Sequence, residues 1–164
     1  MTRLTGPRRT LVVALGNNLM GDDGFGPAVL ARLRQDARVT TATDLLDAHT
    51  DLLGHLERFA GRERVILIDV VLDPDPGTEP GVVVLQEDLF ASWPQASPSC
   101  HQLTPVLAVK LFRALHPDAR CQISLVALRT DGVQTDRLCL TEEAIQQGAK
   151  LVRGLLKTAG PEGG

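Results

Sequence analysis

The sequence predicts an α/β fold in which a mainly parallel, twisted sheet of five strands carries helices on both faces. Two observations support this prediction. Strand-like and helix-like segments alternate along most of the chain, which is typical of a parallel sheet. Several strand candidates are also almost continuous apolar runs, as at 65–71 and 123–128, and strands that are covered on both faces have this composition.

The predicted elements follow one another with short links. Strands are expected at 10–15, 39–46, 64–70, 81–86 and 122–128. Apolar residues recur at helical spacing at 27–35, 50–60, 104–115 and 141–156. Thr141 with the acidic residues after it is a suitable start for the last helix. The short, proline-rich link 72–81 favours an antiparallel strand at or near the sheet edge, and 87–100 is expected to be a longer irregular connection.

Length and composition indicate one globular domain. The 164 residues are long enough for a sizeable core, which must be aliphatic because the chain has no Tyr, one Trp and four Phe. We expect a single domain over 1–164, with flexible ends at 1–8 and 158–164. A net charge of −3 gives no reason to expect a nucleic-acid partner. The apolar run 11–15 is too short for a signal peptide or a membrane span, so we expect a cytoplasmic protein.

The segment 10–30 is the most informative part of the chain. An apolar strand ends at Gly16, a turn rich in glycine follows, and a helical pattern begins at Pro27. The turn carries two adjacent acids, Asp22 and Asp23, at the strand end where open α/β sheets bind ligands. Carboxylates repel phosphate and suit a cation, so a metal site is favoured over a nucleotide site. The motif G-x-G-x-x-G is also absent, which leaves a nucleotide-binding domain as the weaker reading.

Two further acids occupy strand ends. Asp69 interrupts an apolar run, where a carboxylate needs a partner or a metal. It is therefore a candidate site residue, with capping of the next turn as the alternative. Asp47 is more ambiguous. The segment Asp47-Ala48-His49-Thr50 is as consistent with a turn or cap role for Asp47 as with a role in the site.

One of the four histidines is the leading ligand candidate. His101 lies between the long irregular segment and a predicted helix, and His49 is a similar, weaker candidate. His55 and His116 lie within or at the end of helices and are interpreted as structural. Asp23, Asp69 and His101 together offer two carboxylates and one imidazole, which suit a divalent metal with open positions for a substrate ligand.

Nucleophilic catalysis by the protein is not favoured. Cys100 adjoins His101, but neighbouring residues usually point apart, and no serine elbow of the form G-x-S-x-G is present. Cys100, Cys121 and Cys139 are an odd number without C-x-x-C spacing, which argues against a disulfide framework or a structural zinc site.

These motifs resemble those of the hydrogenase maturation endopeptidases. The match is longest in G-N-N-L-M-G-D-D-G-F-G-P-A-V at 16–29. It is supported by V-I-L-I-D-V-V with its following P-G turn and V-V-V strand, by S-C-H-Q-L-T at 99–104, and by L-T-E-E-A at 140–144. The resemblance implies a three-layer α/β/α sandwich. It also implies an endopeptidase that removes the C-terminal extension of a nickel-iron hydrogenase large-subunit precursor after nickel insertion.

In this family the metal-contacting acid, the strand-end aspartate and the histidine correspond to Asp23, Asp69 and His101. The resemblance implies that nickel is supplied by the precursor, and that the site recognises this metal. The chain departs from the family's D-G-G-T or D-G-G-S at 47–50, so Asp47 is carried over as a catalytic candidate only weakly, with His49 as a possible additional site residue. The alternative function is a non-catalytic, nickel-dependent checkpoint or chaperone for the same precursor.

Overall fold

The computed structural model describes residues 8–72, 81–92, 105–130 and 139–158. Its centre is a five-stranded sheet with the strand order β2-β1-β3-β5-β4. Parallel pairing joins four strands, and β4 runs antiparallel to β5 at one edge. The strands are β1 (Thr10–Leu15), β2 (Thr43–His49), β3 (Arg64–Leu72), β4 (Val82–Gln86) and β5 (Gln122–Thr130). The predicted mainly parallel sheet with an antiparallel strand at its edge is confirmed.

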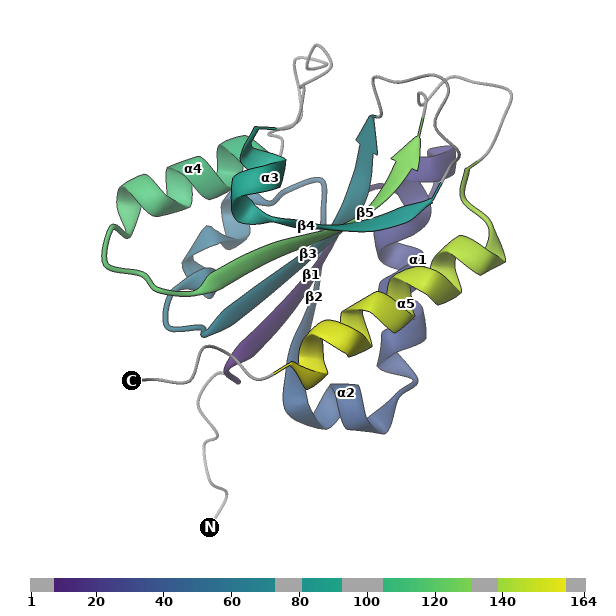
Figure 1. The fold of residues 1–164 in the computed structure, drawn as a ribbon, viewed down its shortest axis with the longest axis horizontal. Coiled ribbons are helices and arrows are strands. Elements are labelled where there is room, and N and C mark those ends of the chain that lie inside the picture. The colour runs from purple at the N-terminus through teal and green to yellow at the C-terminus, as the bar shows by residue number, and fades with distance from the viewer. Residues whose placement is uncertain (1–7, 73–80, 93–104, 131–138, 159–164) are drawn as a thin grey trace.

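Helices cover both faces of this sheet (Figure 1). The α-helices α1 and α5 lie on one face, and α4 with the 3-10 helix η2 lies on the other, so the three-layer α/β/α arrangement is also confirmed. In chain order the helices are η1 (Gly21–Gly24), α1 (Phe25–Arg34), α2 (Ala37–Ala42), η2 (Leu53–Phe59), α3 (Glu87–Ala91), α4 (Pro105–Leu115) and α5 (Glu142–Lys157).

The central strands are apolar on both faces because each face is packed under a helical layer. Along β1, Leu11 and Val13 belong to the core beneath η2 and α4, whereas Val12 and Ala14 belong to the core beneath α1 and α5. All four side chains are fully buried. Alternate residues of a strand point to opposite faces, so a strand between two helical layers needs an unbroken apolar run.

The strand predicted at 39–46 is wrong in its first half. Residues 37–42 form α2, and β2 begins at Thr43. The side chain of Asp36 caps this helix by accepting a hydrogen bond from the backbone N–H of Arg38 at 3.0 Å. Thr43 then donates its hydroxyl to the carbonyl of Val39 at 2.6 Å. Local side-chain bonds of this kind offset the strand preference of the threonines.

Two other predicted segments differ from the structure. The helical segment expected at 50–60 is a 3-10 helix from Leu53 to Phe59. The first part of the expected irregular connection is helix α3. Glu87 of α3 forms a bidentate ion pair with Arg113 of α4, in which Nη2 and Nε of Arg113 donate to the two carboxylate oxygens at 2.6 and 2.9 Å. The rest of that connection, like the ends expected to be flexible, falls mostly outside the described residues.

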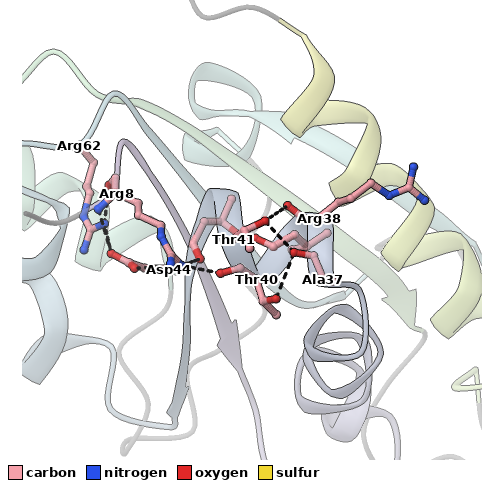
Figure 2. Close-up of polar contacts among 9 residues, drawn as sticks. Arg8, Ala37, Arg38, Thr40, Thr41, Asp44 and Arg62 are labelled. Carbon is pink, nitrogen blue, oxygen red and sulfur yellow. Dashed lines mark hydrogen bonds and ion pairs between the residues drawn. The ribbon is translucent and has the colours of Figure 1, made fainter. Parts of the chain in front are cut away.

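A network of polar contacts joins the chain segments at the amino-terminal edge of the sheet (Figure 2). Asp44, at the start of β2, accepts hydrogen bonds from the side chain of Arg62 and from the backbone N–H of Arg8. Arg8 also donates its Nη1 to the carbonyl of Thr43 at 2.8 Å. The segments that enter β1, β2 and β3 are therefore joined at the edge opposite the one where the predicted site residues lie.

Candidate functional site

Asp69 lies at the carboxyl-terminal edge of the sheet, next to the end of β1. The parallel strands β1 and β3 pair up to Ala14 and Ile68, and Asp69 is the next residue of β3. Its side chain is partly exposed, and its Oδ1 accepts a hydrogen bond from the backbone N–H of Val70 at 2.8 Å. This position is the one expected for a ligand site in an open α/β sheet.

Two glycines bring the acidic turn against this edge. A Cβ atom on Gly26 would lie 2.2 Å from the carbonyl oxygen of Leu15 and 2.7 Å from that of Ile68, so only glycine allows α1 to start so close to both strands. Gly16 has a φ of +116°, and a Cβ there would lie 2.0 Å from the carbonyl oxygen of Asp23. The turn is thus folded back on itself beside the ends of β1 and β3.

Asp23 lies close enough to Asp69 for its charge to act on that carboxyl group. The Oδ2 atom of Asp23 accepts a hydrogen bond from the backbone N–H of Asn17 at 2.7 Å, and the side chain remains partly exposed. Burial raises the pKa of Asp69 to about 7; the Val70 hydrogen bond opposes this rise, and the nearby charge of Asp23 adds to it. Two carboxylates that interact in this way form a site with an excess of negative charge, which a cation would relieve.

The neighbouring acid, Asp22, is buried and has a structural role. It is 4% exposed, and its two oxygens accept hydrogen bonds from the hydroxyl of Thr130 at 2.9 Å and the backbone N–H of Leu140 at 2.7 Å. These bonds join the acidic turn to the end of β5 and to the approach to α5. The sequence does not predict these two bonds, because two adjacent acids in a turn are equivalent in a local pattern and their partners lie far along the chain.

Asp47 and His49 lie at the same edge, beside β1. The pairing of β1 with β2 shifts between Ala14–Asp47 and Leu15–His49, so Ala48 is an extra residue that bends the strand end. Asp47 accepts a hydrogen bond from the backbone N–H of His49 at 3.1 Å, which matches the predicted turn role. The Nδ1 atom of His49 lies 3.4 Å from Oδ1 of Asp47, and its imidazole is exposed.

The backbone of His49 links this pair to the acidic turn. His49 has a φ of 51°, a left-handed conformation that is uncommon outside glycine. Its carbonyl accepts a hydrogen bond from the N–H of Gly16 at 2.8 Å. Asp47 therefore accepts a hydrogen bond from the backbone of this turn, and it also lies at the strand edge that carries the candidate site.

The third predicted ligand, His101, lies outside the described residues, as does Cys100. Within the described ranges, no group of three or more His, Cys, Asp and Glu side chains could hold a metal ion. His116 contacts the ring of Phe112 at 5.0 Å between centroids and lies 3.4 Å from Glu57, in keeping with its predicted structural role. The described part of the site thus consists of Asp23 and Asp69, with Asp47 and His49 beside them.

Solved structures with this fold cover almost the entire chain. The NiFe hydrogenase maturation protease HybD from Thermococcus kodakarensis superposes with a TM-score of 0.67 and 26% sequence identity, over 91% of this chain and 99% of that one. The hydrogenase maturating endopeptidase HybD from E. coli gives a TM-score of 0.68 at 22% identity, over 91% and 92% of the two chains. No family model matches the sequence.

A curated sequence agrees with the structural comparison. The hydrogenase expression/formation protein HupD of Rhodobacter capsulatus is 34% identical over 82 residues, which are 50% of this chain and 38% of that protein. The chain is therefore similar to hydrogenase maturation proteases in fold, and to a hydrogenase formation protein over half of its sequence. These similarities agree with the resemblance to the hydrogenase maturation endopeptidases that the sequence motifs indicate. In the described part of the chain, no helix is long and apolar enough to cross a membrane.

Proposed function

We propose that this chain is an endopeptidase that removes the C-terminal extension of a nickel-iron hydrogenase large-subunit precursor after nickel has been inserted. The observation that carries the proposal is the pair Asp23 and Asp69, which the fold brings together from distant parts of the chain at the edge where such sheets bind ligands. The names of similar proteins, which include maturation proteases and a hydrogenase formation protein, support the same reaction.

The nickel ion in this proposal is the cargo of the substrate. A pair of carboxylates offers oxygen ligands that bind a borderline metal weakly, and ligands already held by the precursor would complete its coordination. The positive charge would also favour the ionised form of Asp69, whose pKa of about 7 leaves it partly protonated in the free protein. Recognition of a loaded precursor therefore depends on both partners, and neither carboxylate needs to hold nickel alone.

His101 is proposed as the third ligand to this nickel. An imidazole beside two carboxylates would strengthen binding of a metal such as nickel. The variant His101→Ala should weaken the nickel-dependent association with the precursor, measured by co-purification with and without nickel. Association that is unchanged would remove His101 from the site.

Cleavage by activated water fits this set of residues because it needs no nucleophile from the protein. Nickel held at Asp23 and Asp69 would polarise the scissile carbonyl, or a carboxylate such as Asp47 would accept a proton from the attacking water. Kinetics of Asp47→Asn separate these roles. If Asp47 is the base, cleavage is lost while nickel-dependent binding remains; if it only holds the turn, cleavage changes little.

Intact-mass analysis of a candidate precursor tests the proposal directly. The precursor is incubated with this protein in nickel-loaded and nickel-free forms, and the masses are compared. We expect a C-terminal fragment to be lost from the loaded form alone. If the precursor co-purifies with this protein in a nickel-dependent way but neither form changes mass, the protein is a non-catalytic checkpoint or chaperone and the endopeptidase proposal is wrong.

A further inference from the structure

The loop between β1 and η1 presents two large apolar side chains to solvent. Leu19 is 88% exposed and Met20 is 53% exposed. Single exposed apolar residues are normal on a protein surface. This pair is of interest because the loop that carries it leads directly into η1, which carries Asp23 of the candidate site.

The loop holds these side chains outward in a fixed backbone conformation. The N–H of Leu19 donates to the Oδ1 atom of Asn17 at 3.0 Å, and the N–H of Met20 donates to the carbonyl of Asn17 at 3.0 Å. The loop also packs closely on η1, since a Cβ on Gly24 would lie 3.2 Å from the Cα of Asn18. A projection that is already ordered loses little backbone entropy when a partner covers it.

The same hydrogen bonds connect the apolar pair to Asp23. The backbone N–H of Asn17 donates to Oδ2 of Asp23 at 2.7 Å, and the N–H of Asp23 donates to the carbonyl of Met20 at 3.2 Å. Asn17 thus donates its N–H to the carboxylate of Asp23, and its two oxygens accept from the backbone N–H groups of Leu19 and Met20. Met20 lies three residues before Asp23 and is hydrogen-bonded to it, so a side chain that flanks a bond held at Asp23 would be within reach of this pair.

We propose that Leu19 and Met20 form the contact for an apolar side chain of the precursor segment that flanks the scissile bond. The inference rests on the proposed endopeptidase function and adds a feature of its substrate. The exposed side chains of Leu19 and Met20 offer a substrate side chain no hydrogen bond or ion pair of their own, whereas an apolar side chain would gain by burial against them. The pair sets affinity for the precursor, while the chemistry belongs to the carboxylates.

Steady-state processing of the nickel-loaded precursor tests this contact. Leu19→Ser and Met20→Ser should each raise KM, by about tenfold or more for Leu19, with kcat changed by less than about twofold. Leu19→Met keeps an apolar side chain and should retain near-normal KM. Leu115→Ser is the matched control, because Leu115 is also exposed, at 59%, but lies at the end of α4 that leads into the start of β5. All four variants should melt close to the wild type.

Three results would overturn the inference, and they differ from one another. A normal KM for Leu19→Ser and Met20→Ser, with wild-type cleavage intact, removes the contact and leaves the proposed function standing. A wild-type protein that sediments as a dimer, and becomes monomeric with Leu19→Ser, assigns the pair to contact between copies of this chain. Failure of the wild type to cleave any precursor rejects the function and the contact together.

Discussion

At the scale of single residues, Asp69 combines a role in the candidate site with a free-energy cost to the fold. Its carboxyl group holds a proton up to about pH 7, whereas in the unfolded chain it would ionise near its ordinary pKa of 3.8. Between these values the folded state binds one more proton than the unfolded state. The contribution of Asp69 to stability therefore falls as the pH rises from about 4 to about 7.

The variant Asp69→Asn should be more stable than the wild type at pH 8. Asparagine keeps an acceptor for the backbone N–H of Val70 and cannot ionise. One pKa unit corresponds to about 1.4 kcal/mol, so the stability gap should grow by several kcal/mol between about pH 4 and 7 and level off above. Urea unfolding of both proteins across this range measures the gap. A gap that widens toward low pH would contradict the raised pKa.

The same substitution should remove the proposed activity. Asp23→Asn and Asp69→Asn should each reduce processing of the nickel-loaded precursor by about 100-fold or more, since each takes away a charged ligand. Both proteins should still unfold cooperatively. Asp118→Asn, in the exposed turn after α4, is the control and should process normally. Near-normal cleavage by either site variant would exclude that residue from metal recognition.

The candidate site shows what the sequence can predict at this scale. Asp69 could be identified from the sequence because a carboxylate within a buried apolar run needs a partner or a metal. The structure places it at the carboxyl-terminal edge of the sheet, where such folds bind ligands. The local pattern gives no physical reason to prefer Asp23 over Asp22, and the family resemblance supports the choice of Asp23. The physical difference between them lies in contacts with Thr130 and Leu140, more than 100 residues away, which no local pattern encodes.

At the scale of elements, the packing of α5 on α1 depends on the small size of Gly148. A Cβ added there would lie 2.8 Å from both the ring of Phe25 and a methyl group of Val29, which are buried in α1. Gly148→Ala should therefore destabilise the protein by about 1–3 kcal/mol through overpacking. Thermal or urea unfolding measures this loss.

A second glycine in the same helix provides the matched control. A Cβ on Gly154 would meet no atom within 4 Å. Gly154→Ala should stabilise the protein by up to about 1 kcal/mol, because alanine is the better helix former. If Gly148→Ala and Gly154→Ala changed the free energy of unfolding equally, the packing between α1 and α5 would not restrict the size of the side chain at position 148.

Asp22 joins η1 to the end of β5 and to the residues that lead into α5. Asp22→Ala leaves the N–H of Leu140 and the hydroxyl of Thr130 without this acceptor, and it should destabilise the protein by roughly 2–4 kcal/mol. Processing measured well below the melting temperature should also fall, because η1 carries Asp23. Thr130→Val removes one of the two bonds and should have a smaller effect on both measurements. A full processing rate in Asp22→Ala would mean that Asp23 is positioned without this tie.

Element types were predictable where the apolar pattern extends through the whole segment. The strands β1, β3 and β5 and the helices α1, α4 and α5 all fall near their predicted positions, since burial on one or two faces sets their periodicity. The error at 39–46 arose where threonines favour a strand by propensity but cap and bond a short helix locally. Short elements are decided by such contacts, and these are not visible as periodicity.

At the scale of the whole molecule, the two edges of the sheet have separate tasks. The carboxyl-terminal edge carries Asp23 and Asp69, whose like charges oppose one another. The amino-terminal edge carries the network of Asp44 with Arg8 and Arg62, in which opposite charges meet (Figure 2). The ion-pair network thus stabilises the fold at the edge opposite the candidate site, where the network does not interfere with a ligand.

This division predicts that Asp44→Ala reduces stability without changing catalysis. The side chain of Arg62 is only 5% exposed, and loss of its carboxylate partner should destabilise the protein by about 2 kcal/mol. Burial pushes the pKa of Asp44 up, but hydrogen bonds from Arg62 and Arg8 outweigh it and leave the pKa below its ordinary 3.8. The stability difference from the wild type should therefore persist above about pH 4 and shrink as the pH falls below it. Urea unfolding from pH 3 to 7 tests this, and kcat for precursor processing at 25 °C should match the wild type. A lower kcat with unchanged stability would show that the amino-terminal edge acts on the site, against the separation of tasks.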